Sequence, residues 1–97
     1  MSDFIISPAA RQDLMEIWEY IAQDNLDAAD CVAEEIRAEI RMLAQNLGLG
    51  HYRTDLANEP LKFWRVYTYL IIFRPETQPL EIVRILSEYQ DLKRILE

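Results

Sequence analysis

The fold is decided by residues 61–74, which read Leu-Lys-Phe-Trp-Arg-Val-Tyr-Thr-Tyr-Leu-Ile-Ile-Phe-Arg. This run is the densest in β-branched and aromatic residues, and it contains no Gly, Pro or acidic residue. Residues of these types suit a pleated, half-buried surface. Because the run is too long for one typical strand, we expect two strands that meet near Tyr67 and Thr68. Tyr69–Phe73 is almost entirely apolar, which predicts a central strand covered on both faces.

A helical hairpin is expected between a short strand at Asp3–Ser7 and this central run. Ser7 is a good N-cap, and Pro8 suits the first helical position because its missing N–H would be unpaired there. The break is expected at residues 24–27, and the second helix continues to about Gln45 or Asn46. So short a link predicts an antiparallel pair that docks on the sheet. Each helix has an apolar stripe at helical spacing, formed by Leu14, Ile17, Trp18 and Ile21 in the first and by Ala29, Val32, Ala33, Ile36, Ile40, Leu43 and Leu47 in the second.

The remaining chain predicts a turn at residues 74–79, a strand at Leu80–Ser87 and a short helix at Gln90–Glu97. Strict alternation in the strand places Leu80, Ile82, Arg84 and Leu86 on one face. Helices followed by strands indicate an α+β fold. We therefore expect one domain over residues 1–97, with a strand, an antiparallel helix hairpin, a three-stranded antiparallel meander and a short C-terminal helix.

Charge is unevenly distributed along the 97 residues. The net charge is −7, and residues 8–47 hold nine acidic residues against three basic ones. So acidic a chain is not a general binder of nucleic-acid phosphates. The simplest interpretation of these acids, which include Asp13, Glu16 and Glu19, is a solvated helix face.

The single cysteine and the single histidine do not indicate a catalytic or metal-binding site. Cys31 is the only cysteine, which excludes an internal disulfide and suits a reducing cytoplasm. We interpret it as a structural thiol, and His51, the only histidine, as a surface residue of a loop running from Gly48 to Pro60. Gly48 and Gly50 are expected to need positive φ. We expect no catalytic residue, metal site or cofactor, and we find no signal peptide and no apolar run of membrane-spanning length.

Several short motifs occur in a fixed order along nearly the whole chain. They are Ala10–Leu14 with Ile17, Trp18, Tyr20 and Ile21; Asn25 with Ala28 and Ala29; Gly50 followed by Arg53–Leu56; Trp64–Val66 and Tyr69–Arg74; and Ile82–Leu86 with Asp91 and Leu92. In this order and spacing the chain resembles the ParE/RelE superfamily of bacterial toxins from type II toxin–antitoxin modules, and the ParE branch in particular. The resemblance implies a RelE/ParE-like fold.

The departures from the superfamily pattern concern the end of the last strand. Many members have His, then Gly, then an Arg-Asp pair where this chain has Ser87, Glu88 and Gln90-Asp91. RelE-like members, which cut messenger RNA on the ribosome, carry a basic residue in the central strand, where this chain has Leu70. They also carry a Tyr near the C-terminus, and no Tyr follows Asp91.

The resemblance to ParE implies a cytoplasmic, non-enzymatic toxin that inhibits DNA gyrase and arrests growth. Its partners would be gyrase and a ParD-like antitoxin, in a toxin–antitoxin hetero-oligomer that contacts neither nucleic acid nor membrane directly. Two alternatives stay open. One is a weakly toxic, antitoxin-bound corepressor, suggested by Ser87 and Gln90. The other is a RelE-like ribosome-dependent mRNA endonuclease with a basic patch of Arg53, Lys62, Arg65, Arg74 and Arg84.

Two sets of contact residues follow from this resemblance and from side-chain chemistry. Aromatic residues and arginines are expected to bind the antitoxin, because an antitoxin segment can lie as a helix and strand across apolar surface and arginine pairs with carboxylates. The antitoxin-binding set is Trp18, Tyr20, Arg53, Trp64, Arg65, Tyr67 and Arg74. The target-binding set is the C-terminal helix, Lys93, Arg94, Ile95 and Leu96.

Overall fold

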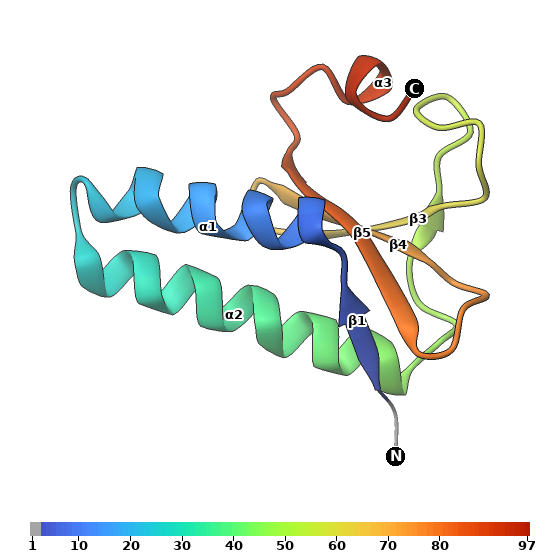
Figure 1. The fold of residues 1–97 in the computed structure, drawn as a ribbon, viewed down its shortest axis with the longest axis horizontal. Coiled ribbons are helices and arrows are strands. Elements are labelled where there is room, and N and C mark those ends of the chain that lie inside the picture. Colours follow the sequence, from blue (N-terminus) through green and yellow to red (C-terminus); the bar gives the residue numbers. More distant parts are fainter. Residues whose placement is uncertain (1–2) are drawn as a thin grey trace.

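A computed structural model describes residues 3–97 and shows a five-stranded sheet with a helical hairpin on one face (Figure 1). The spatial strand order is β1-β5-β4-β3-β2; β1 runs parallel to β5 and all other neighbours are antiparallel. The expected α+β fold is confirmed. The elements are β1 (Phe4–Ile6), α1 (Pro8–Ala22), α2 (Leu26–Gln45), β2 (His51–Tyr52), β3 (Lys62–Val66), β4 (Tyr69–Arg74), β5 (Leu80–Ser87) and α3 (Leu92–Ile95).

The central run forms the β3–β4 hairpin at the expected place. Val66 pairs with Tyr69, and the turn between them is made by Tyr67 and Thr68. Tyr67 has φ 57°, a conformation that a two-residue hairpin turn requires and that non-glycine residues adopt uncommonly. β4 lies between β3 and β5 with Ile71–Phe73 buried, which confirms the prediction of a central strand.

The prediction of strict alternation in β5 is wrong beyond its middle. The register with β4 shifts between Ile72, which pairs with Arg84, and Phe73, which pairs with Ile82. This β-bulge adds a residue to one strand and changes which side chains share a face. Leu86 therefore lies with the apolar cluster opposite to the one that Ile82 joins.

The sequence predicted that the whole segment between α2 and β3 is a loop, and this prediction is wrong. β2 pairs at the sheet edge through His51 with Phe63 and Tyr52 with Lys62. A strand of two residues is too short to produce a sequence pattern. Gly50 has φ +98°, and an added Cβ would lie 2.8 Å from Cζ of Phe73, so the expected positive φ is confirmed there. The positive φ expected at Gly48 was wrong, because only Gly50 has it.

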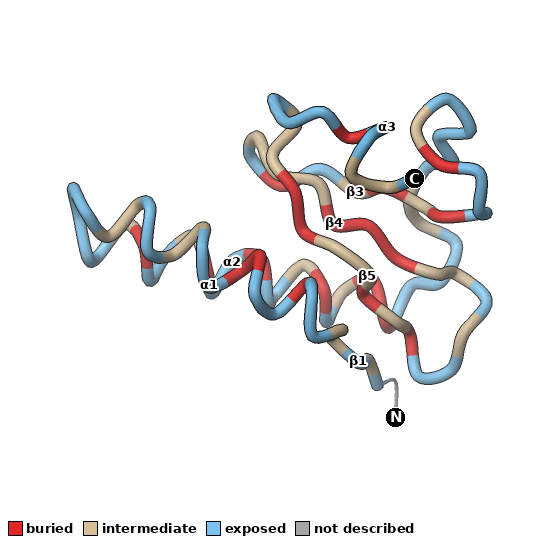
Figure 2. The backbone as a smooth tube through the Cα atoms, turned by 45° about the horizontal axis from the view of Figure 1, so that its top comes forward, coloured by how far each residue is buried: buried red, intermediate tan, exposed pale blue. Residues whose placement is uncertain are grey.

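The sheet is covered on its two faces by layers of different thickness. We call the apolar core between the sheet and the helical hairpin the helix-side cluster, and the one beneath α3 and the 56–61 segment the C-terminal cluster. Figure 2 shows buried residues gathering on β4 and β5 between these layers, while the turn joining α1 to α2 lies far from the strands. The helix-side cluster includes Leu14, Ile36, Ile40, Leu43, Ile71, Phe73, Ile82 and Ile85, and the C-terminal cluster includes Ala57, Leu61, Phe63, Ile72, Leu86 and Leu92.

Side-chain caps define the helix starts, at Ser7 as expected. The Oγ of Ser7 accepts from the backbone N–H of Ala10 at 3.0 Å and donates to the carbonyl of Val83 at 2.7 Å, so it also ties α1 to β5. Asn25 caps α2, and Asp91 caps α3. α3 occupies only Leu92–Ile95, within the longer helix predicted. No helix in residues 3–97 combines the length and apolar character needed to cross a membrane.

Candidate functional site

A partly buried ion pair anchors α1 to β5. The Asp13 carboxylate accepts from Nε and Nη2 of Arg84 at 2.7 and 2.9 Å and from the backbone N–H of Ile85 at 3.0 Å. Asp13 is only 7% exposed, so its expected place on a solvated helix face is wrong. The hydrogen bond to Asp13 raises the pKa of Arg84. Because Arg84 pairs with Asp13, it is not free to belong to the basic patch of the mRNA endonuclease alternative.

Three of the predicted aromatic contact residues are held by acidic residues of α2. Their rings are half-buried or exposed beside the helical hairpin, and each polar atom at the ring edge donates to a carboxylate. The hydrogen bond also raises the pKa of Tyr67. Trp18 Nε1 donates to Asp30 at 2.8 Å, Trp64 Nε1 donates to Glu39 at 3.2 Å, and Tyr67 Oη donates to Glu35.

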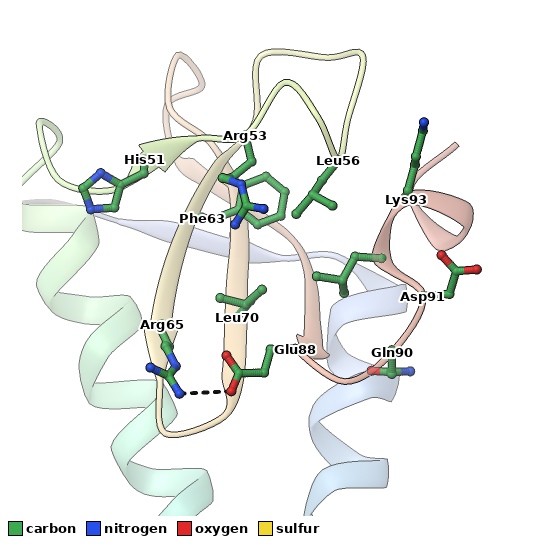
Figure 3. Close-up of a pocket in the computed structure, with 11 residues that line it drawn as sticks. His51, Arg53, Leu56, Phe63, Arg65, Leu70, Glu88, Gln90, Asp91 and Lys93 are labelled. Carbon is green, nitrogen blue, oxygen red and sulfur yellow. Dashed lines mark hydrogen bonds and ion pairs between the residues drawn. The ribbon is translucent and has the colours of Figure 1, made fainter.

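A cavity of about 610 Å³ opens on the sheet face away from α1 and α2 (Figure 3). We call it the sheet pocket. Its walls come from β2, β3, β4 and the segment that leads from β5 into α3. Apolar side chains of the C-terminal cluster line the interior, and charged side chains surround it. The lining residues are His51, Arg53, Leu56, Phe63, Arg65, Leu70, Glu88, Gln90, Asp91, Leu92 and Lys93.

The arginines of the sheet pocket are paired by neighbouring acids. Arg65 Nη2 lies 3.0 Å from Glu88 Oε1. The dashed line in Figure 3 marks this ion pair. Arg53 donates to both carboxylate oxygens of Asp55 at 3.0 and 2.9 Å, which raises the pKa of Arg53 and lowers that of Asp55. Leu70 lines the pocket between them, and a leucine can neither transfer a proton nor stabilise a developing charge. The arrangement offers an apolar surface with a charged rim, which suits binding more than proton transfer.

The predicted antitoxin-binding residues fall in four places. Arg53 and Arg65 meet in the sheet pocket, whereas Trp18, Trp64 and Tyr67 lie along α2 on the opposite side of the sheet. Tyr20 is 72% exposed on α1. Arg74, at the end of β4, pairs with Glu59 and, at 2.9 Å, with Glu81.

The predicted target-binding residues differ in accessibility. Lys93 and Arg94 are exposed on α3, and Lys93 reaches the rim of the sheet pocket. Ile95 and Leu96 are half-buried against the C-terminal cluster. A partner that binds α3 would therefore meet the two basic side chains first.

The single cysteine and the single histidine both lie on the surface. Cys31 is exposed, and its interpretation as a structural, unreactive thiol stays a prediction. His51 is exposed as expected, but it lines the sheet pocket beside Arg53. Within residues 3–97 no group of three or more His, Cys, Asp or Glu side chains could hold a metal ion.

Sequence reasoning missed a groove of about 460 Å³ between α1 and the ends of β4 and β5. Tyr20, Tyr69 and Tyr89 line it, and Tyr89 is the most exposed large apolar side chain described, at 81%. Burial raises the pKa of Tyr69. The signal available in the sequence was a tyrosine among the polar residues that follow β5, where an apolar ring has no strand neighbours to cover it.

Comparison with known proteins identifies the family of this chain. The sequence model of the family described as "ParE toxin of type II toxin-antitoxin system, parDE" matches residues 4–92. Curated proteins offer no match. Among solved structures, a chain from "Chromosomal ParDE TA system from P. aeruginosa" aligns with a TM-score of 0.72 and 20% identity, covering 90% of this chain and 96% of that chain. That identity shows the fold alone, but the family match spans nearly the whole sequence. The chain therefore belongs to the ParE toxin family of type II toxin–antitoxin systems.

Proposed function

We propose that this chain inhibits DNA gyrase by binding it and is neutralised by a ParD-like antitoxin. The observation that carries the proposal is the ParE family match over residues 4–92. The solved relative is described as part of a ParDE system, which supports an antitoxin of that type as the first partner.

The sheet pocket supports inhibition by binding and not by turnover. An RNA-cutting site needs groups that activate a hydroxyl and stabilise charge on phosphorus. Here Leu70 stands in the central strand, and the arginines beside it are engaged by Asp55 and Glu88. Exposed ion pairs contribute little to stability, so a binding partner can replace them at little cost.

The helical hairpin supports the antitoxin contact. Its joined ends project beyond the sheet (Figure 1). Along the hairpin, Met15, Tyr20 and Leu26 are each more than half exposed. Exposed apolar side chains on paired helices suit an amphipathic helix from a partner. The outer edge of β2, where both residues are exposed, offers a place for a strand of the same partner.

For gyrase we propose α3 as the contact, through Lys93 and Arg94. Deleting residues 92–97 would not test this cleanly, because Leu92 is buried in the C-terminal cluster. The double variant K93E/R94E changes two exposed side chains and leaves the buried leucine in place.

The experiment uses purified chain freed of antitoxin, titrated into a gyrase supercoiling reaction on relaxed plasmid. We expect supercoiling to fall and cleaved DNA to accumulate, with K93E/R94E weaker and Arg41→Glu, which lies on α2 away from α3, equal to the wild type. Full supercoiling at large excess of folded chain would contradict the proposal. Inhibition unaffected by K93E/R94E would leave the gyrase proposal standing and remove α3 as the contact.

A further inference from the structure

We propose that the groove between α1 and the ends of β4 and β5 binds an arginine-bearing segment of the target protein, gyrase. This inference rests on the proposed function and adds a second contact surface to α3. The groove has a volume of about 460 Å³, and we call it the tyrosine groove. It is lined by Tyr20 from α1, Tyr69 from the start of β4 and Tyr89 from the segment after β5.

The tyrosine rings combine open faces with unused polar atoms. Tyr20 is 72% exposed and Tyr89 is 81% exposed, whereas Tyr69 is half-buried and Ile85, which also lines the groove, is buried. Within residues 3–97 none of the three hydroxyl groups makes a hydrogen bond, in contrast to Tyr67, which donates to Glu35. Tyrosine loses little conformational entropy on binding and often dominates the energy of an interface. Three such rings around one groove therefore form a surface suited to a partner.

The tyrosine groove carries a negative charge that no neighbouring base neutralises. Glu16 lines it, is exposed, and makes no ion pair within residues 3–97; its carboxylate accepts only from the Gln12 amide, at 3.2 Å. The other acid of the lining, Asp13, is already paired with Arg84. Among the described residues no lysine or arginine lines this groove, whereas three basic side chains line the sheet pocket. The free charge of the groove is therefore negative.

Aromatic rings beside a free carboxylate select a cationic side chain, and arginine in particular. A guanidinium group can stack flat on a tyrosine ring while its N–H groups pair with a carboxylate, and the compact ammonium of lysine matches this geometry less well. The surrounding helical hairpin, with nine acidic residues against three basic ones in residues 8–47, would attract a basic segment and repel an acidic one.

The position of the tyrosine groove makes it continuous with α3, the contact that we propose for gyrase. Tyr89 and Gln90 line the groove, and Gln90 also lines the sheet pocket, whose rim Lys93 reaches. A partner bound to Lys93 and Arg94 needs to extend only along this segment to enter the groove. Because the two contacts have opposite charge, they would bind an acidic and a basic region of the same target and so fix its orientation.

The first test measures the affinity of antitoxin-free chain for gyrase, by calorimetry, for wild type and for Y20A/Y89A. We expect the double variant to bind more weakly by about tenfold or more, because it removes two exposed rings from the contact. Y20F/Y89F keeps both rings and should bind nearly as well as the wild type. Leu47→Ala is the control, because it shortens an exposed apolar side chain beside the β4–β5 turn, at the opposite end of the strands.

The second test concerns the charge of the occupant. Glu16→Lys should weaken gyrase binding strongly, and Glu16→Gln should weaken it less while reducing the dependence of the affinity on salt. Glu76→Lys makes the same reversal at an exposed position of the β4–β5 turn and should bind like the wild type. An equal salt dependence for wild type and Glu16→Gln would overturn the assignment of a cationic occupant.

The outcomes separate this inference from the function on which it rests. Wild type that fails to bind gyrase overturns both. Wild type that binds gyrase while Y20A/Y89A binds it equally well overturns the tyrosine groove alone, and so does a Y20A/Y89A variant that loses affinity only for the antitoxin. The circular dichroism spectrum and melting temperature of Y20A/Y89A should match those of the wild type. If they do not, the salt dependence of Glu16→Gln decides.

Discussion

The two faces of the sheet are held by different kinds of interaction. On the helix side, a long hairpin covers the strands, a partly buried ion pair joins α1 to β5, and aromatic rings donate to carboxylates of α2. On the other side, the four-residue helix α3 and the 56–61 segment cover a smaller cluster, and the neighbouring ion pairs of Arg53 and Arg65 are exposed. The helix side therefore carries most of the stability, whereas the sheet-pocket side can exchange its contacts when a partner binds.

The largest effect is expected from the Asp13–Arg84 anchor. Asp13→Ala leaves the partly exposed Arg84 guanidinium and the buried Ile85 N–H without their acceptor. Breaking a fully buried pair costs about 3–5 kcal/mol of unfolding free energy, and we expect a loss near the low end of that range here. Chemical denaturation of wild type and variant would measure the difference. A loss close to that of an exposed ion pair would show that the two faces are not held differently.

The C-terminal cluster should respond less strongly. Leu92→Ala removes a buried side chain that α3 places against the sheet, and we expect a loss of about 2 kcal/mol, at the low end for leucine because the site is near the surface. The same denaturation experiment measures it. A loss larger than that of Asp13→Ala would reverse the assignment of stability to the helix side.

A still smaller effect is expected at the aromatic rings beside α2. Trp64→Phe keeps an aromatic ring in the helix-side cluster but removes the Nε1 donor to Glu39, which should cost about 1 kcal/mol. Glu39→Gln, which keeps an acceptor, is the control and should lose less. Equal losses would show that the charge of Glu39, and not the hydrogen bond, stabilises this contact.

The exposed contacts should have the smallest effects on stability, and their contributions are lost at opposite ends of the pH range. Arg53 lowers the pKa of Asp55, so its contribution is present above the ordinary carboxyl pKa and is lost as the pH falls through the lowered value. Glu35 raises the pKa of Tyr67, so that contribution is present below the ordinary tyrosine pKa and is lost as the pH rises through the raised value. Asp55→Asn should leave the melting temperature at pH 7 almost unchanged. A marked drop would place the sheet-pocket side among the stabilising regions.

The sequence predicted the fold well and the sites only in part, for physical reasons. The apolar run around Ile71 and the cap at Ser7 report local preferences, so the hairpin and the start of α1 were predictable. The β5 bulge is a property of pairing with β4, and alternation along one strand cannot reveal it. Asp13 was placed in solvent because its acceptor role depends on Arg84, 71 residues away in the chain.

The predicted contact residues show the same limit. Their types were chosen for binding chemistry, but Arg53 and Trp64 lie on opposite sides of the sheet, and residue type alone does not show which face a side chain takes.

The most direct test of the central claim is the stoichiometry of inhibition. Antitoxin-free chain is added to a gyrase supercoiling reaction, and the antitoxin is then titrated back. The account predicts that supercoiling is lost when the chain is added. It should return once enough antitoxin has been added to bind all of the chain. Undisturbed supercoiling, together with cleavage of messenger RNA when the same preparation is added to a translating extract, would contradict it.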